Sequence, residues 1–326
     1  MSQSSLRIVF MGTPEFAVAS LDALVQAGYA VVGVVTAPDK PAGRGMKLTE
    51  SAVKKYAEEK EIPVLQPEKL RAPEFLEALK ALHADLQVVV AFRMLPEVVW
   101  NMPPMGTINV HGSLLPQYRG AAPINWAVIN GEKETGVSTF KLKHEIDTGN
   151  ILLQESFPIG ENETAGDVHD RMKEIGAQLL VKTIKELETG TLIEKEQSTE
   201  SLMQKAEGIM QSSEHLELKH APKIFTETCK IDFSKSAEEV HNLIRGLSPF
   251  PGAFTFLNEK MLKIYRSKKE SFSSDNENEN VVGSYQTDGK TFLKFVCKDG
   301  FIQVLELQLE GKKRMTIEEF LRGYRF

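Results

Sequence analysis

Four short, largely apolar segments recur through the first third of this 326-residue chain, and stretches with helical periodicity lie between them. The apolar runs cover residues 6–11, 31–36, 86–92 and 107–111, and the helical stretches cover 13–26, 49–61, 73–83 and 95–100. Strands that are apolar on both faces and alternate with helices are typical of a parallel sheet covered on both sides. The sequence therefore predicts a Rossmann-like, mostly parallel α/β sheet.

The pattern changes after residue 136. Residues 137–143 and 151–157 are expected to form strands that pair across a loop, and residues 164–187 a long amphipathic helix. Residues 193–220 are polar and irregular, and 271–280 predict a further loop. A helix at 237–247 and short strands at 253–257, 261–266, 281–286, 291–297 and 301–309 predict a small β-barrel or sandwich. We therefore expect a first domain over residues 1–192, a linker at 193–209 and a second domain over residues 210–326.

The composition is ordinary for a globular protein, with 41% hydrophobic residues, 26% charged residues and a net charge of −6. No apolar run approaches the roughly 18 residues needed to span a bilayer, and the first residues lack the apolar core of a signal peptide. The two cysteines, Cys229 and Cys297, have no metal-type spacing. These features predict a cytoplasmic protein without a membrane segment or a metal. The negative charge restricts contact with a polyanion to local patches.

Asn109 and His111 lie two residues apart at the end of the fourth apolar run, just before a Gly-Ser turn. Alternate side chains of a strand share one face, and parallel sheets bind ligands at the carboxyl ends of their strands. Asn supplies an N–H donor for a developing oxyanion, and His can carry a proton at neutral pH. Asp147 supplies a carboxylate that would orient the imidazole. Together they suit acyl or one-carbon transfer to an amine. The alternative is that the pair only satisfies backbone groups at a strand end.

Other chemistries lack their sequence signatures. Ser113 is not part of a Gly-x-Ser-x-Gly elbow, and neither cysteine has a local nucleophile pattern. The segment after the first strand lacks the Gly-x-Gly-x-x-Gly pattern of a dinucleotide turn, and Gly43-x-Gly45 lacks the ending of a phosphate-binding loop. Direct attack by an acceptor amine, without a covalent enzyme intermediate, is the simplest reaction left.

Two basic segments stand out from the acidic background. Residues 39–47 form a Gly/Pro loop that carries Lys40, Arg44 and Lys47. Residues 260–269 are strand-like and lysine-rich, and alternation places Lys263 and Tyr265 on one face. Each segment is either a solvated surface or a contact with a polyanion such as a nucleic-acid backbone.

The order and spacing of several segments resemble those of the folate-dependent formyltransferases, from about residue 6 to the end of the chain. These segments are Ile8-Val-Phe-Met-Gly-Thr-Pro-Glu-Phe-Ala17, Pro41-Ala-Gly-Arg-Gly45, Asn109-x-His111, Ser113-Leu-Leu-Pro116, Tyr118-Arg-Gly-Ala-Ala-Pro123, Asp147-Thr-Gly149 and Ile244-Arg-Gly-Leu-Ser-Pro-Phe-Pro-Gly-Ala253.

The resemblance implies that the first domain transfers the formyl group of 10-formyltetrahydrofolate, with Asn109, His111 and Asp147 as the catalytic trio. It further implies that two segments contact the folate; they contain Ser113, Leu114, Leu115, Pro116, Phe92, Met94 and Leu95. The family often has Tyr-Gly where this chain has Phe92-Arg93. Arg93 therefore either departs from the usual folate pocket or simply points to solvent.

The resemblance also implies an acceptor and a second domain. The acceptor would be the amino group of methionine esterified to initiator tRNA, and the second domain an OB-like β-barrel that supports tRNA binding. The resemblance matches residues 39–47 to a basic loop that enters the acceptor end of the tRNA, with Arg44, Lys40 and Lys47 as the contacts. Lys263, in the second basic segment, is a further candidate for contact with the tRNA backbone. We expect a monomer that needs no protein partner. The competing hypotheses are a formyltransferase for a sugar amine or glycinamide ribonucleotide, which the basic loop and second domain disfavour, and a non-enzymatic RNA-binding module, which the complete trio disfavours.

Overall fold

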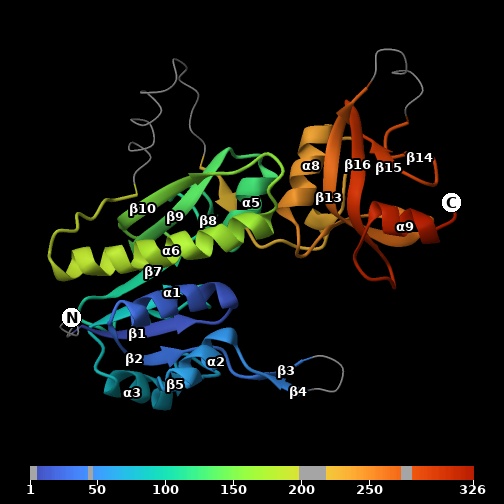
Figure 1. Cartoon of the computed structure of the whole chain (residues 1–326). Coiled ribbons are helices and arrows are strands. Elements are labelled where there is room, and N and C mark those ends of the chain that lie inside the picture. The colour runs from blue at the N-terminus through green and yellow to red at the C-terminus, as the bar shows by residue number, and fades with distance from the viewer. Residues whose placement is uncertain (1–5, 43–46, 198–217, 273–280) are drawn as a thin grey trace, which may run out of the picture. The chain divides into compact units, whose positions relative to one another are not determined.

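The computed structural model describes residues 6–42, 47–197, 218–272 and 281–326 (Figure 1). The chain divides into two compact units. The first contains Met1–Gly120, Gly136–Phe157 and His169–Lys219, and the second contains Ala121–Thr135, Pro158–Val168 and His220–Phe326. None of the helices in the described ranges combines the length and the apolar character that crossing a membrane requires.

The first unit is built on a seven-stranded sheet with the strand order β10-β9-β7-β6-β1-β2-β5. The strands are β1 (Arg7–Gly12), β2 (Ala30–Val35), β5 (Val64–Leu65), β6 (Leu86–Val90), β7 (Thr107–His111), β9 (Glu134–Lys141) and β10 (Ile151–Pro158). The pairs β1–β2, β1–β6, β6–β7 and β2–β5 are parallel, and β7–β9 is antiparallel. The prediction of a mostly parallel sheet is therefore confirmed, and β9 and β10 are neighbours as expected.

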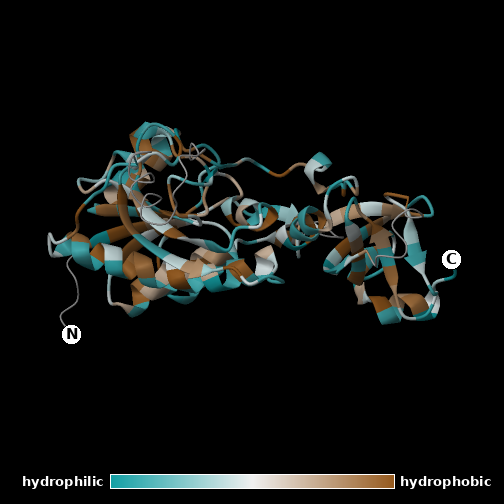
Figure 2. Ribbon diagram, turned by 90° about the horizontal axis from the view of Figure 1, so that it is seen from above, coloured by the Kyte–Doolittle hydropathy of each residue, from teal (hydrophilic) through white to brown (hydrophobic). Residues whose placement is uncertain are grey.

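Helices cover both faces of this sheet. They are α1 (Glu15–Gln26), α2 (Ala52–Glu59), α3 (Pro73–Ala81), α4 (Glu97–Trp100) and α6 (Ala165–Glu188). On one face, α3 and α4 share a core cluster with Val9, Met11 and Val89. On the other, Gly176 of α6 packs against Val110, and α1 lies beside α6. Figure 2 shows predominantly hydrophobic strands and helices that alternate between hydrophobic and hydrophilic residues.

Local signals explain where the helices begin and end. Helix α3 starts with Pro73, whose missing N–H is not needed in a first helical turn. The side chain of Ser51 accepts a hydrogen bond from the Lys54 backbone N–H and so caps α2. Beyond the end of α1, Gly28 has a φ of 82°, which an L-residue with a side chain rarely adopts.

The basic segment predicted as a loop contains a small hairpin. Strands β3 (Lys40–Ala42) and β4 (Lys47–Thr49) pair with each other, with Ala42 opposite Lys47. Asp39, just before β3, accepts hydrogen bonds from Lys54 and Gln66, which lower the pKa of its carboxyl group. The base of the hairpin is thus tied to α2, while Arg44 lies outside the described residues.

The second unit centres on an antiparallel sheet with the order β12-β13-β16-β15-β14, to which β17 adds through β16. Its elements are α5 (Pro123–Ile129), β11 (His220–Ala221), the 3₁₀ helix η1 (Glu227–Cys229), α8 (Ala237–Gly246), β12 (Ala253–Leu257), β13 (Lys260–Ser271), β14 (Tyr285–Thr287), β15 (Leu293–Val296), β16 (Gly300–Leu309), β17 (Met315–Thr316) and α9 (Ile317–Gly323). The sheet curls around a core in which Phe233 stacks on Phe295, which confirms the expected OB-like barrel in the form of a half-barrel.

The strand predicted at residues 281–286 is wrong over most of its length. Residues 281–284 form a turn rather than the start of a strand, because both the N–H and the hydroxyl of Ser284 donate to the Val281 carbonyl and Gly283 has a φ of 84°. The expected loop at 271–280 lies largely outside the described residues. The sequence analysis did not predict helix α9, although Thr316 and Glu319 form a capping box that marks its N-terminus.

Candidate active site

Strand β7 carries two residues of the predicted trio. It lies between β6 and β9, with Asn109 opposite Phe140 and His111 opposite Ser138 of β9. Because side chains alternate, Asn109 and His111 leave the same face of the sheet, at the carboxyl end of the strand. His111 is buried, with its ring edge-on to that of Phe140. Asn109 is half-buried, and its amide makes no hydrogen bond to a residue in the described ranges, so its N–H groups remain available to a ligand.

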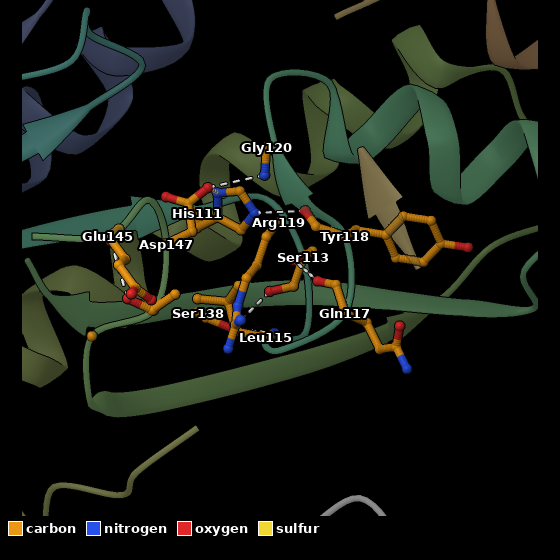
Figure 3. A network of polar contacts seen from close by, with 12 residues as sticks. His111, Ser113, Leu115, Gln117, Tyr118, Arg119, Gly120, Ser138, Glu145 and Asp147 are labelled. Carbon is orange, nitrogen blue, oxygen red and sulfur yellow. Dashed lines mark hydrogen bonds and ion pairs between the residues drawn. The ribbon is translucent and has the colours of Figure 1, made fainter. Parts of the chain in front are cut away.

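The imidazole of His111 is held from both sides (Figure 3). Its Nε2 lies 2.9 Å from the carbonyl oxygen of Tyr118, which can only accept, so Nε2 carries a hydrogen and donates it. Its Nδ1 faces Asp147 Oδ2 at 3.8 Å. That distance is longer than a hydrogen bond but well within the range of electrostatic attraction. The structure thus brings His111 and Asp147 together, as the sequence predicts.

Asp147 lies in the tight loop between β9 and β10. Its backbone has a φ of 55°, a left-handed conformation that Asp tolerates better than most residues. Its Oδ2 accepts a hydrogen bond of 3.0 Å from the backbone N–H of Gly120. Two residues later, a Cβ on Gly149 would lie only 1.5 Å from the Lys141 carbonyl oxygen, so only glycine fits there. The loop is therefore fixed by contacts with β8 (Arg119–Gly120) and β9.

The segment after β7 is rigid and uses its polar groups internally. Ser113 donates its hydroxyl hydrogen to the Gln117 carbonyl at 2.6 Å. The Ser138 hydroxyl donates to the Ser113 carbonyl and accepts from the Leu115 N–H. Leu115 itself packs into a small core cluster. The Ser113 hydroxyl is thus occupied and buried, which agrees with the absence of a serine-nucleophile signature.

The segment after β6 lies at the same edge of the sheet, because β6 and β7 are parallel neighbours. Met94 is 72% exposed there, an unusual exposure for a large apolar side chain, whereas Leu95 is buried. Phe92 packs on the edge of the core. Arg93 does not simply point to solvent, because its guanidinium donates to the backbone carbonyls of Pro67 and Glu68 and so ties two loops together.

The residues predicted to bind tRNA are in different situations. Lys40 is exposed on β3, and Lys47 lies on the paired strand β4. Arg44 is outside the described residues. Lys263 is half-buried on β13, and its ammonium donates to the Pro251 carbonyl at 2.8 Å.

Sequence reasoning missed Gln197. This residue reaches the Asp147 loop and is contacted by Arg119. It lies in the polar stretch predicted as a linker, and no motif marked it. Within the described ranges, no three His, Cys, Asp or Glu side chains gather in a way that could hold a metal ion.

Comparison with known proteins gives a consistent picture. The formyl transferase family model matches residues 6–184, and the model of the formyl transferase C-terminal domain matches residues 223–325. Methionyl-tRNA formyltransferase of Azobacteroides pseudotrichonymphae is 52% identical over 329 residues, covering 99% of this chain and 97% of that protein. The Bacteroides fragilis protein of the same name is 50% identical with the same coverage.

A solved structure shares the fold. The sugar 3N-formyl transferase WlaRD, studied in the presence of dTDP and 5-N-formyl-THF, superimposes with a TM-score of 0.65 and covers 95% of this chain and 100% of its own. Its sequence identity of 20% makes this a likeness of fold.

Proposed function

The chain belongs to the formyl transferase family, and we propose that it moves the formyl group of 10-formyltetrahydrofolate onto the amino group of methionyl initiator tRNA through Asn109, His111 and Asp147. The observation that carries the residue assignment is the pairing of His111 with Asp147 at the carboxyl edge of β7, on the face from which Asn109 also projects. Identity of about half the residues over the whole length to methionyl-tRNA formyltransferases supports the acceptor.

His111 acts through Nδ1. Since Nε2–H is engaged by the Tyr118 carbonyl, protonation adds the second hydrogen at Nδ1, beside Asp147. The 3.8 Å separation from Asp147 leaves Nδ1–H able to donate to a formyl oxygen. Asn109 supplies a second donor from the same face. Both donors stabilise the negative charge that develops on the formyl oxygen when the amine adds.

The transfer needs no covalent enzyme intermediate. The bond that forms joins the methionyl nitrogen to the formyl carbon, and the bond that breaks joins this carbon to N10 of the folate. The amine loses one proton and N10 takes one up. The role of the chain is to hold the two substrates in line and to stabilise the oxyanion between these steps.

The folate binds along the loops after β6 and β7 in this proposal. Met94 offers exposed apolar surface to the donor, with Phe92 and Leu95 behind it. The segment Ser113–Pro116 offers its rigid backbone and the half-buried side chain of Leu114, rather than the occupied Ser113 hydroxyl.

The acceptor tRNA contacts both parts of the chain in this proposal. Arg44, Lys40 and Lys47 bind near its acceptor end through phosphate contacts, and Lys263 aids from the second domain. We place the catalytic domain at residues 1–192, the linker at 193–209 and the OB-like tRNA-binding domain at 210–326. We further propose that the protein acts as a cytoplasmic monomer; its two free cysteines are buried and suit a reducing compartment.

The test is a formylation assay with charged initiator tRNA and 10-formyltetrahydrofolate, run beside an amino-sugar acceptor. His111→Ala and Asp147→Ala should each lower kcat by about 100- to 1000-fold, the usual loss when an oxyanion-stabilising group is removed. His144→Ala, at an exposed histidine in the same loop, is the matched control and should keep wild-type activity. Normal turnover by a folded His111→Ala variant, or preference for the amino sugar, would refute the proposal.

A further inference from the structure

The chain on either side of residues 198–217 lies against the loops that hold the catalytic pair. We propose that Gln197 and the backbone of Lys219 belong to the active site and position Asp147 and His111. This inference rests on the proposed function, because it assigns positioning groups to the same trio.

Gln197 clamps the loop that carries Asp147. Its Nε2 donates to the carbonyl oxygens of Asp147 and Gly149, at 2.8 and 2.7 Å. Its Oε1 accepts from Nε and Nη2 of Arg119, at 3.0 and 2.7 Å. The side chain thus uses both ends of its amide, and the planar guanidinium fixes which end is which.

Arg119 links this clamp to the carboxylate itself. It directly precedes Gly120, whose N–H donates to Asp147 Oδ2. Partial burial lowers the pKa of Arg119, against the opposing attraction of Asp147 and Glu145. The Asp147 carboxylate and backbone are therefore held by neighbouring residues of one short strand, one directly and one through Gln197.

The main chain of Lys219 positions His111 indirectly, through its hydrogen bonds to neighbouring residues. Its carbonyl accepts from the Tyr118 N–H at 2.7 Å, and its N–H donates to Gln117 Oε1 at 2.8 Å. The carbonyl of Tyr118 is the group that accepts the Nε2–H of His111. Tyr118 has a φ of 58°, a conformation that a bulky side chain adopts only when its surroundings impose it.

Residues 194 and 195 anchor the segment independently of Gln197. Glu194 pairs with Lys141 and accepts from the Asn150 amide, and Lys195 exchanges backbone hydrogen bonds with Ile151. Loss of the Gln197 side chain should therefore leave the segment in place. Its effect should be confined to the geometry of the Asp147 loop, which makes the residue suitable for a selective test.

The experiment compares Gln197→Ala, Gln197→Glu and the neighbouring exposed control Glu196→Ala in the formylation assay. Gln197→Glu keeps the shape and the acceptor for Arg119 but places an oxygen against two carbonyl oxygens. We expect both Gln197 variants to lose about 10- to 100-fold in kcat, the order seen when catalytic groups are misplaced. The KM for the folate and the Tm should stay at wild-type values, and Glu196→Ala should be fully active.

The split between kcat and the KM for the folate separates positioning from packing. As a second arm, Gln117→Ala removes the acceptor of the Lys219 N–H and should lower kcat several-fold at unchanged folate KM.

The possible outcomes distinguish failure of this inference from failure of the proposed function. Wild-type kcat in Gln197→Glu would show that packing alone suffices and would overturn the inference. A kcat loss accompanied by a lower Tm and a raised folate KM would assign the residue a general structural role and would also overturn it. If Gln197→Ala is active while His111→Ala is inactive, this inference fails and the proposed function stands. If His111→Ala is itself active, the proposed function fails.

Discussion

The substitution Gly149→Ala tests how closely the backbone of the Asp147 loop packs against β9. The added Cβ would lie 1.5 Å from the Lys141 carbonyl oxygen, whereas such contacts are practically never shorter than 3.0 Å. The loop must therefore move by about 1.5 Å, the difference between these distances, or the β9 backbone must yield. Lys141 is held in place because its N–H donates to the Asn150 carbonyl and the next residue is bonded to β7.

The displacement acts directly on the catalytic pair. Gly149 follows Asp147 by two residues, and both carbonyls share the Gln197 amide. A shift of about 1.5 Å away from β9 would lengthen the 3.8 Å between Asp147 and His111 to about 5 Å. Misplacement of this size typically lowers a rate about 100-fold. The overpacking itself should destabilise the fold by about 1–3 kcal/mol, which corresponds to a Tm lower by several degrees.

The assay is single-turnover formylation of charged tRNA together with a thermal melt. Gly323→Ala is the control, because a Cβ there has no neighbour within 4 Å and both readouts should match the wild type. A Gly149→Ala protein whose kcat lies within about threefold of the wild type, at unchanged Tm, would show that the loop accommodates the methyl group and would refute the geometric reasoning.

Two further predictions concern other parts of the chain. Arg44→Ala should raise the KM for tRNA about tenfold and leave the folate dissociation constant unchanged, because a lost phosphate contact affects the polyanion alone; equal losses for both substrates would contradict this. Burial lowers the pKa of His241; the Glu161 backbone and the Glu238 carboxylate oppose this shift, and the charges of Arg245 and Lys269 add to it. The unfolded state therefore takes up the proton more readily, and stability falls as pH drops below about 6.5. Melts at pH 7.5 and 5.5 should show a loss smaller by about 1 kcal/mol in His241→Gln, and equal losses would contradict the assignment.

The sheet of the first unit was predictable because its strands are marked by their own residues. The segments 6–11 and 86–92 are largely apolar on both faces, as burial on both sides requires, and in 107–111 the apolar Ile108 and Val110 alternate with polar residues; each segment overlaps an observed strand. The hairpin β3–β4 was not predictable in this way, since Pro41 and the flanking glycines read as a loop. Its base depends on the tertiary pairing of Asp39 with Lys54.

The same distinction applies to the active site. Asn109 and His111 could be paired from sequence because strand periodicity fixes their common face, and Asp147 was added by the order of motifs. Gln197 could not be found, because a polar residue in a polar stretch differs from its neighbours only through the partners that folding supplies. Its partners are backbone carbonyls and an arginine that already belongs to a motif. The glutamine at position 197 therefore indicates no function by itself. The trio thus defines the chemistry, and in our inference Gln197 and the backbone of Lys219 define how accurately the trio is held.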